Sequence, residues 1–166
     1  LEKEEIKKIL PHREPLLLID QATLSASENR VEAKVNVEAD WLVFTGHFPE
    51  KPMLPGNYMI ESMAQTADIF AVSRAEPGKN TIIVSGEPDA FYHPVYPGEC
   101  MYLTAEIMTD AGNGMYDCKV SARTENRSGG CRCHYAGFKK QWNKYEEKTM
   151  TNLEKYNNIL KRKFNR

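Results

Sequence analysis

The residues best suited to chemistry lie in one segment of the sequence, between Thr45 and Gln65. This segment reads TGHFPEKPMLPGNYMIESMAQ. It contains a histidine, His47, among prolines that stiffen the backbone, and a carboxylate, Glu61, fourteen residues later. Between them, Gly56 stands at the expected start of a helix, where the missing side chain permits a ligand to approach the backbone.

Residues of these types can perform an acid/base elimination. Such a reaction needs a base to remove a proton, an acid for the leaving group, and hydrogen-bond donors for the charge that develops on a carbonyl oxygen. His47 and Glu61 can supply the base and the acid. The N–H groups near Gly56 can supply the donors, because the first amides of a helix lack intrahelical partners and lie at the positive end of its dipole.

Each of these residues also has an ordinary structural explanation. A single histidine more often satisfies a turn than takes part in a reaction. Glu61 falls on one face of the expected helix with Asn57, Gln65 and Asp68, which is typical of a solvated stripe. Residue types and spacing alone therefore leave elimination of water as one chemistry among several.

The elements expected around this segment are those of an α+β domain. Glu2–Leu10 predicts a short amphipathic helix that ends before Pro11. Trp41–Pro55 is too rich in proline for regular structure, and Gly56–Ser73 predicts one long helix. The stretches that predict strands are Leu16–Ile19, Arg30–Val37, Thr81–Ser85, Ala90–Tyr92, Cys100–Met108, Met115–Arg123 and Gly130–Lys139. An antiparallel sheet with one long helix must pack that helix on a sheet face.

Length and composition indicate one folded domain. The chain has 166 residues, of which 41% are hydrophobic, and this is enough for one sizeable core. No apolar stretch approaches the length of a membrane span. The sequence opens with charged residues and not with a secretory leader. We therefore expect a cytoplasmic protein without a membrane segment.

The cysteines indicate neither disulfides nor a metal site. Cys100, Cys118, Cys131 and Cys133 are expected as thiols in an intracellular protein of this size. Cys131, Cys133 and His134 form a C-x-C-H run, but this run alternates like a strand and lacks a second ligand pair at a zinc spacing. We expect no bound metal.

Charge is distributed unevenly along the chain. Lys139–Arg166 contains 9 basic and 3 acidic residues, whereas Leu1–Phe138 contains 13 basic and 20 acidic residues. Apolar residues recur in the tail at helical spacing, at Leu153, Tyr156, Leu160 and Phe164. The tail has no nucleic-acid-binding signature, so we expect no nucleic-acid partner. We interpret residues 1–140 as the main domain and 141–166 as a basic helical extension that docks on the body or attracts an acidic protein.

The segment Thr45–Gln65 resembles the signature of the FabZ-type 3-hydroxyacyl-[acyl-carrier-protein] dehydratases, which have the hotdog fold. Two further stretches resemble this family in the same order, namely ILPHREPLLLID from Ile9 and FYHPVYPG from Phe91. The resemblance extends over about Ile6–Lys139. It implies an antiparallel sheet wrapped around one long central helix.

The resemblance also implies a function. It implies dehydration of 3-hydroxyacyl thioesters, carried on acyl carrier protein, in fatty-acid or related acyl and polyketide biosynthesis. His47 matches the family's catalytic histidine, Glu61 its catalytic carboxylate, and Gly56 the glycine whose N–H faces the thioester carbonyl. Family subunits pair, so His47 of one subunit would work with Glu61 of its partner in a homodimer or a trimer of dimers. The elimination itself requires no cofactor.

Candidate substrate-binding residues lie on the expected long helix. An apolar tunnel for the acyl chain could be lined by Met59, Met63 and Phe70, although core packing is the commoner role for such residues. Asn57 and Tyr58 stand where the family usually has small apolar residues, and His93 stands where it usually has arginine, which indicates altered specificity. His12 and Arg13 also match the family's opening segment, and we interpret both as structural or surface residues.

Two other interpretations stay open. A hotdog thioesterase needs a carboxylate that activates water against the thioester carbonyl, and this chemistry does not require the pairing of His47 with Glu61. A catalytically silent paralogue would keep the fold and bind acyl carrier or a partner subunit. Such a paralogue would be expected to lose one member of the pair, and this chain has both.

Overall fold

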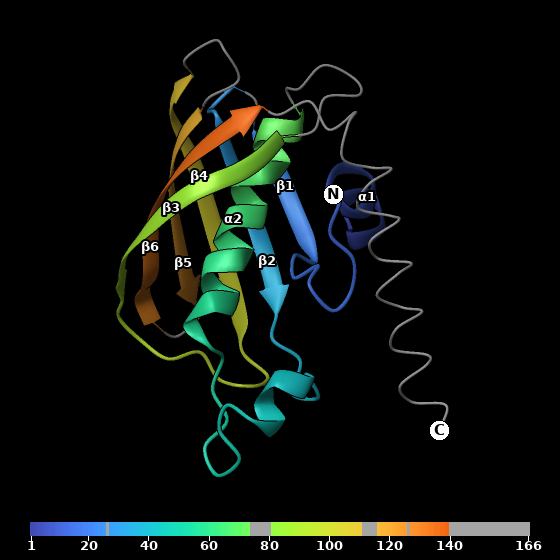
Figure 1. The fold of residues 1–166 in the computed structure, drawn as a ribbon, viewed down its shortest axis with the longest axis vertical. Coiled ribbons are helices and arrows are strands. Elements are labelled where there is room, and N and C mark those ends of the chain that lie inside the picture. Colours follow the sequence, from blue (N-terminus) through green and yellow to red (C-terminus); the bar gives the residue numbers. More distant parts are fainter. Residues whose placement is uncertain (26, 74–80, 111–115, 126, 140–166) are drawn as a thin grey trace, which may run out of the picture.

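One long helix, α2 (Gly56–Ser73), lies against one face of an antiparallel sheet in the computed structural model (Figure 1). The structure describes residues 1–139 with gaps at 26, 74–80, 111–115 and 126. Within these residues the strands are β1 (Gln21–Ser25), β2 (Arg30–Asn36), β3 (Thr81–Phe91), β4 (Cys100–Asp110), β5 (Tyr116–Thr124) and β6 (Arg127–Lys139). They form one six-stranded sheet in the order β1-β2-β4-β5-β6-β3, and each neighbouring pair is antiparallel.

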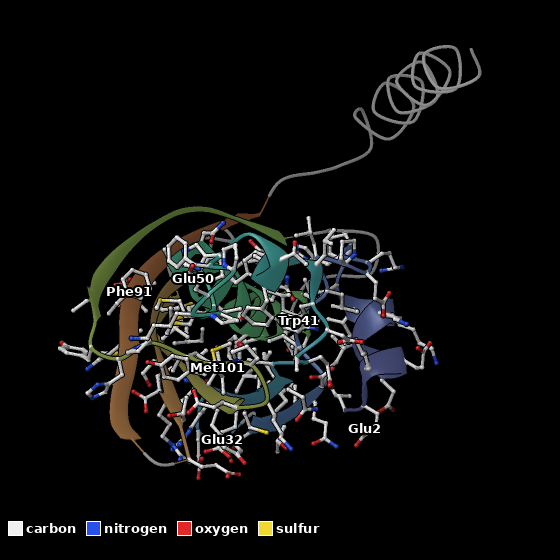
Figure 2. All side chains as sticks on the ribbon, turned by 90° about the horizontal axis from the view of Figure 1, so that it is seen from below. Glu2, Glu32, Trp41, Glu50, Phe91 and Met101 are labelled. Atoms are coloured by element: carbon white, nitrogen blue, oxygen red, sulfur yellow. The ribbon has the colours of Figure 1, made fainter. Side chains whose placement is uncertain are left out.

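The core fills the space between the sheet and α2. Alternation along β2 turns Val31, Ala33 and Val35 toward the helix, and all three are buried. α2 contacts β2, β3, β4, β5 and β6, so most of its circumference is covered. Seen nearly along the helix axis, the sheet curves around α2 (Figure 2). The expected α+β architecture, a sheet wrapped around one central helix, is confirmed.

The short helix α1 (Lys3–Ile9) packs beside β1 at the edge of the sheet (Figure 1). Glu2 and Glu5 form a capping box at its start, and Ile6 is its fully buried residue. The helix ends at Ile9, and Leu10 is extended because Pro11 disfavours the helical conformation in the residue before it. The predicted helix is confirmed.

The predicted strand Leu16–Ile19 is wrong. Three of its four residues are buried, but the backbone is irregular. The carbonyl of Leu16 and the N–H of Leu18 bond to the side chain of Gln65 and not to a neighbouring strand. The strand that pairs with β2 in this part of the sequence is β1, which begins at Gln21, after the predicted strand. A short apolar run fits any buried backbone, so hydrophobicity alone could not distinguish these cases.

Two further differences concern the loop before α2 and the strand after it. Trp41–Pro55 was expected to be irregular, and it contains a short 3₁₀ helix, η1 (Leu42–Thr45). The predicted strands Thr81–Ser85 and Ala90–Tyr92 belong to one strand, β3, whose register with β6 shifts twice. Because β3 pairs with β6 on both sides of these two shifts, it stays one strand where the sequence indicated an interruption.

The expectations for the cysteines, the C-terminal extension, membrane segments and metals can be compared with the structure only where residues are described. Cys100 and Cys118 are free thiols, and burial raises the pKa of Cys118 to about 12, so this thiol is unreactive. The side chains of Cys131 and Cys133 lie outside those described, as does the whole predicted extension 141–166. In the part of the chain that is described, no helix is long and apolar enough to cross a membrane. The same residues include no cluster of three potential metal ligands.

Candidate active site

His47 is fixed in the loop between η1 and α2 by three hydrogen bonds. Its backbone N–H donates to the carbonyl of Val43 at 2.9 Å, and its own carbonyl accepts from the N–H of Met53 at 3.0 Å. Its ring Nδ1 lies 2.8 Å from the carbonyl oxygen of Met53. Since a carbonyl can only accept, Nδ1 carries the proton, and the lone pair of the neutral ring is on Nε2. His47 is thereby held in the tautomer that can act as a base.

His47 opens onto a cavity of about 290 Å³ at the start of α2. The full lining consists of His47, Met53, Leu54, Gly56, Met59, Phe91, Tyr92, His93 and Pro94. Three residues that the sequence singled out, His47, Gly56 and Met59, therefore meet in one place. His93, noted as a departure from the family pattern, lies there too.

Gly56 is the first residue of α2, and the ring of Phe91 lies where a side chain at this position would begin. A Cβ at this position would lie 3.0 Å from Cζ of Phe91, closer than ordinary packing allows. Its N–H belongs to the first turn of the helix, where no carbonyl one turn earlier is available. The absence of a side chain therefore lets the Phe91 ring and any ligand in this cavity come close to a helix start.

Glu61 lies on another side of α2. It borders a second cavity of about 350 Å³, together with His12, Leu16, Leu18, Asn57 and Tyr58. The two cavities have no lining residue in common. At 3.6 residues per turn, Glu61 is rotated about 140° around the helix from Gly56. Within one chain, His47 and Glu61 are therefore not brought together.

Two side chains hold the carboxyl group of Glu61. Nε2 of Gln65 donates to Oε1 at 2.8 Å, and Nε2 of His12 lies 3.3 Å from the same oxygen. The hydrogen bond from His12 is the main cause that lowers the pKa of Glu61; Gln65 lowers it further, and burial opposes both. The same contact raises the pKa of His12. The pair thus favours a carboxylate beside an imidazolium.

Gln65 is itself anchored from both ends of its amide. It is fully buried, its Oε1 accepts from the N–H of Leu18 at 3.0 Å, and its Nε2 donates to the carbonyl of Leu16 at 2.6 Å. The expectation of a solvated stripe on this helix face is wrong here, since Gln65 and Asp68 are buried. The segment that contains Leu16 and Leu18 holds the Gln65 side chain, and Gln65 in turn holds Glu61.

Sequence reasoning missed the partners of Glu61. His12 was interpreted as structural or surface, yet it contacts the candidate acid. Its position inside the family-like opening segment was a usable signal, as was the spacing of four between Glu61 and Gln65, which places both on one helix face. Neither signal reveals that the opening segment folds back onto α2.

The other predicted substrate-binding residues lie in two places, beside the Glu61 cavity and in the core. Asn57 and Tyr58 border the Glu61 cavity and not the cavity of Gly56. Tyr58 also lines a third cavity of about 450 Å³ and packs against Trp41, with ring centroids 6.2 Å apart. Met63 and Phe70 are buried in the core. Contact of these residues with substrate stays a prediction.

The fold and this arrangement define a hotdog protein with acid/base residues around the start of its central helix. A model of the FabA-like domain matches residues 10–126. The 3-hydroxyacyl-[acyl-carrier-protein] dehydratase FabZ of Ruminiclostridium cellulolyticum is 37% identical over 128 residues, 76% of this chain and 89% of that protein. FabZ of Sinorhizobium medicae is 43% identical over 111 residues, 66% of this chain and 72% of that protein. The chain belongs to the FabZ-type 3-hydroxyacyl-[acyl-carrier-protein] dehydratase family, as its sequence motifs implied.

Solved structures agree on the fold. The dehydratase heterocomplex ApeI:P from Xenorhabdus doucetiae matches with a TM-score of 0.66 at 19% identity, over 89% of this chain and 97% of that one. A thioesterase from Haemophilus influenzae matches with a TM-score of 0.59 at 15% identity, over 77% and 82%. At these identities the likeness shows the fold alone, and the expected hotdog fold is confirmed.

Proposed function

We propose that this chain removes water from 3-hydroxyacyl thioesters carried on acyl carrier protein, and so produces 2-enoyl thioesters for fatty-acid or related acyl biosynthesis. The observation that carries the proposal is the fixed tautomer of His47 beside the helix start at Gly56. In a chain of this family, that juxtaposition offers a base and amide donors to one thioester group.

His47 is the base in this proposal. Its Nε2 takes the proton from C2, and the electron pair of that bond forms the C2–C3 double bond as the C3–O bond breaks. Negative charge that develops on the thioester oxygen is stabilised by the N–H of Gly56. The departing hydroxyl takes a proton from Glu61 and leaves as water.

We propose further that the working site combines His47 of one subunit with Glu61 of the partner subunit in a homodimer. Support comes from the separate cavities of the two residues within one chain. Large apolar side chains beside these cavities are 46% to 54% exposed, at Phe48, Phe91, Tyr92 and Leu16. A second copy of the chain would cover such side chains.

The acyl chain would extend from the His47 cavity along α2. Met59 borders that cavity, and Met63 and Phe70 follow it on the same helix face, so the three could line a tunnel. Asn57 and Tyr58 would contact the substrate on the Glu61 side. Bulk and an amide at these positions are expected to restrict which 3-hydroxyacyl chains fit.

Turnover by the wild-type chain and two variants tests the proposal. The substrates are 3-hydroxyacyl thioesters of several lengths, on acyl carrier protein and on a small thiol. Loss of a general base or acid costs about 10²–10⁴-fold in rate, so His47→Ala and Glu61→Gln should each lose at least a hundredfold. Glu106→Gln, on an exposed site of β4, is the matched control and should stay within about twofold of wild type.

The products distinguish the alternatives. A dehydratase forms the enoyl thioester and releases no thiol, whereas a thioesterase releases free thiol. Wild-type protein that binds the carrier but forms neither product would be a silent paralogue. Activity of either site variant within threefold of wild type would contradict the assignment of that residue.

A further inference from the structure

His12 is presented to Glu61 by a fixed backbone. It lies in the loop between α1 and β1, where the carbonyl of Arg13 accepts the N–H groups of Leu16 and Leu17 at 2.9 and 3.0 Å. Its Nε2 is 3.3 Å from Oε1 of Glu61, at the long end of hydrogen-bonding distance. The side chain of His12 is 26% exposed and that of Glu61 is 39% exposed, so the pair borders solvent and is open to a ligand.

The carboxyl group of Glu61 is engaged through one oxygen. Oε1 receives both Gln65 and His12, whereas Oε2 has no hydrogen-bond partner among the described residues. Nδ1 of His12 is buried and likewise has no partner in the part of the chain that the structure describes. Among these residues, Glu61 is thus the hydrogen-bond partner of the imidazole, and Oε2 is the carboxyl oxygen without a protein partner.

An acid at neutral pH must have a proton to donate. An unperturbed glutamate has a pKa of about 4.3, and His12 lowers the pKa of Glu61 further, so this carboxyl group is ionised near pH 7. The pKa of His12 is raised by Glu61 first and by Asp68, while burial and Arg13 oppose the shift. The one proton of the pair therefore resides mainly on His12.

We propose that His12 is a positioning residue for Glu61: it holds Oε1 of the carboxyl group and supplies the proton that Glu61 passes to the leaving hydroxyl. The inference rests on the proposed function and adds the source of the proton. Glu61 takes the Nε2 proton of His12 and becomes neutral, and the departing oxygen takes this proton from the carboxyl group as the C3–O bond breaks. His47 has meanwhile gained the C2 proton. Exchange with solvent then deprotonates His47 and reprotonates His12.

The pH dependence of turnover tests this role in the full chain. His12→Gln keeps an N–H near Oε1 but cannot titrate, whereas His12→Ala removes both functions. Lys8→Gln, on the exposed side of α1, removes a positive charge without touching Glu61 and is the matched control. The quantity to compare is kcat of wild type divided by kcat of each variant, from about pH 8 to about pH 5, because effects of pH that do not involve residue 12 cancel in this ratio.

We expect the ratio for His12→Gln to be about 10² near pH 8 and to fall steadily toward pH 5, as Glu61 becomes protonated by solvent. His12→Ala should show the same trend with a larger ratio throughout, because its carboxyl group is also less well held. A ratio near one at all pH values for His12→Gln would overturn the proposal. A loss that does not change with pH and follows a drop in thermal stability would overturn it too, since that is the signature of a structural role.

A readout without turnover separates this inference from the proposed function. The imidazole of His12 can be titrated by nuclear magnetic resonance in wild type and in Glu61→Gln. The pKa of His12 should fall in the variant, because the carboxylate that raises it is gone. An unchanged pKa in Glu61→Gln would overturn the His12–Glu61 pair even if the wild-type enzyme is active. If the pKa of His12 falls in Glu61→Gln but the wild-type protein shows no dehydratase turnover, the proposed function has failed and the pair has not.

Discussion

The neighbours of His47 and Glu61 determine what each residue can do. The carbonyl of Met53 fixes the proton of His47 on Nδ1, which leaves Nε2 basic. His12 and Gln65 both bind the carboxyl group of Glu61, which keeps it ionised and oriented. The same two residue types elsewhere on the surface would lack this arrangement.

Substitution of Gly56 tests whether the substrate thioester must come close to the backbone at the start of α2. Gly56→Ala would place a Cβ 3.0 Å from Cζ of Phe91, so the ring must move by a few tenths of an ångström, which its 46% exposure permits. We therefore expect little loss of stability, partly because alanine favours the helix by about 0.5–1 kcal/mol over glycine. Catalysis should fall by about tenfold or more, since the thioester carbonyl is pushed away from its donor.

Gly46→Ala is the matched control for this prediction. A Cβ there meets no atom within 4 Å, and the backbone φ of −117° suits any residue. Steady-state kinetics and thermal unfolding of both variants are the measurements. Equal activities of the two variants would mean that the space around Gly56 does not matter for the reaction.

At the scale of elements, Gln65 joins α2 to the irregular segment that precedes β1. Gln65→Leu has a similar volume but removes the partner of the buried Leu18 N–H and of the partly exposed Leu16 carbonyl. An unsatisfied buried group costs about 1–3 kcal/mol, whereas water can reach the Leu16 carbonyl, so the free energy of unfolding should fall by about 1–3 kcal/mol. Urea unfolding measures this change.

Asn57→Leu provides the comparison on the same helix. Asn57 is exposed, and exchange of an exposed amide for leucine should alter the free energy of unfolding by no more than about 0.5 kcal/mol. If both variants unfold at the same urea concentration as wild type, Gln65 does not anchor the segment. Turnover of Gln65→Leu should also drop, because Glu61 loses one of its two supports.

Most elements could be predicted from the sequence because their residues alternate or repeat with a clear period. β2 and the first half of β4 bury every second residue, and α2 is long and free of proline. β1 could not be predicted, since Ala22 is its one buried residue and its alternation is therefore weak. The residues His47 and Gly56 could be placed together, whereas the contact of His12 with Glu61 depends on a fold-back that no local pattern encodes.

At the scale of the whole molecule, His47 and Glu61, the two candidate catalytic residues, border separate cavities within one chain. Phe91, which lines the His47 cavity, lies at the margin of the molecule when it is viewed nearly along α2 (Figure 2), whereas Tyr58 borders the Glu61 cavity. β3 forms an edge of the described sheet, with backbone groups on one side free to pair with another strand. These features support the proposal that the site is completed by association.

Mixed dimers test whether the site is shared between subunits. His47→Ala and Glu61→Gln proteins are each expected to be inactive, but a dimer with one subunit of each kind would have one intact site. Random pairing makes half of all dimers mixed, so about a quarter of wild-type activity should return after the two proteins are unfolded and refolded together. Turnover of the mixture at constant total protein is the measurement.

Two controls make the outcome interpretable. His47→Ala mixed in the same way with the double variant His47→Ala/Glu61→Gln can form no intact site, so its mixture should stay inactive. Exchange of subunits is verified by differently tagged copies that purify together. If tagged copies do exchange and activity still does not return, the site lies within one chain. His47 and Glu61 would then have to be brought together by a movement around α2, which is hard to reconcile with a helix that contacts five strands.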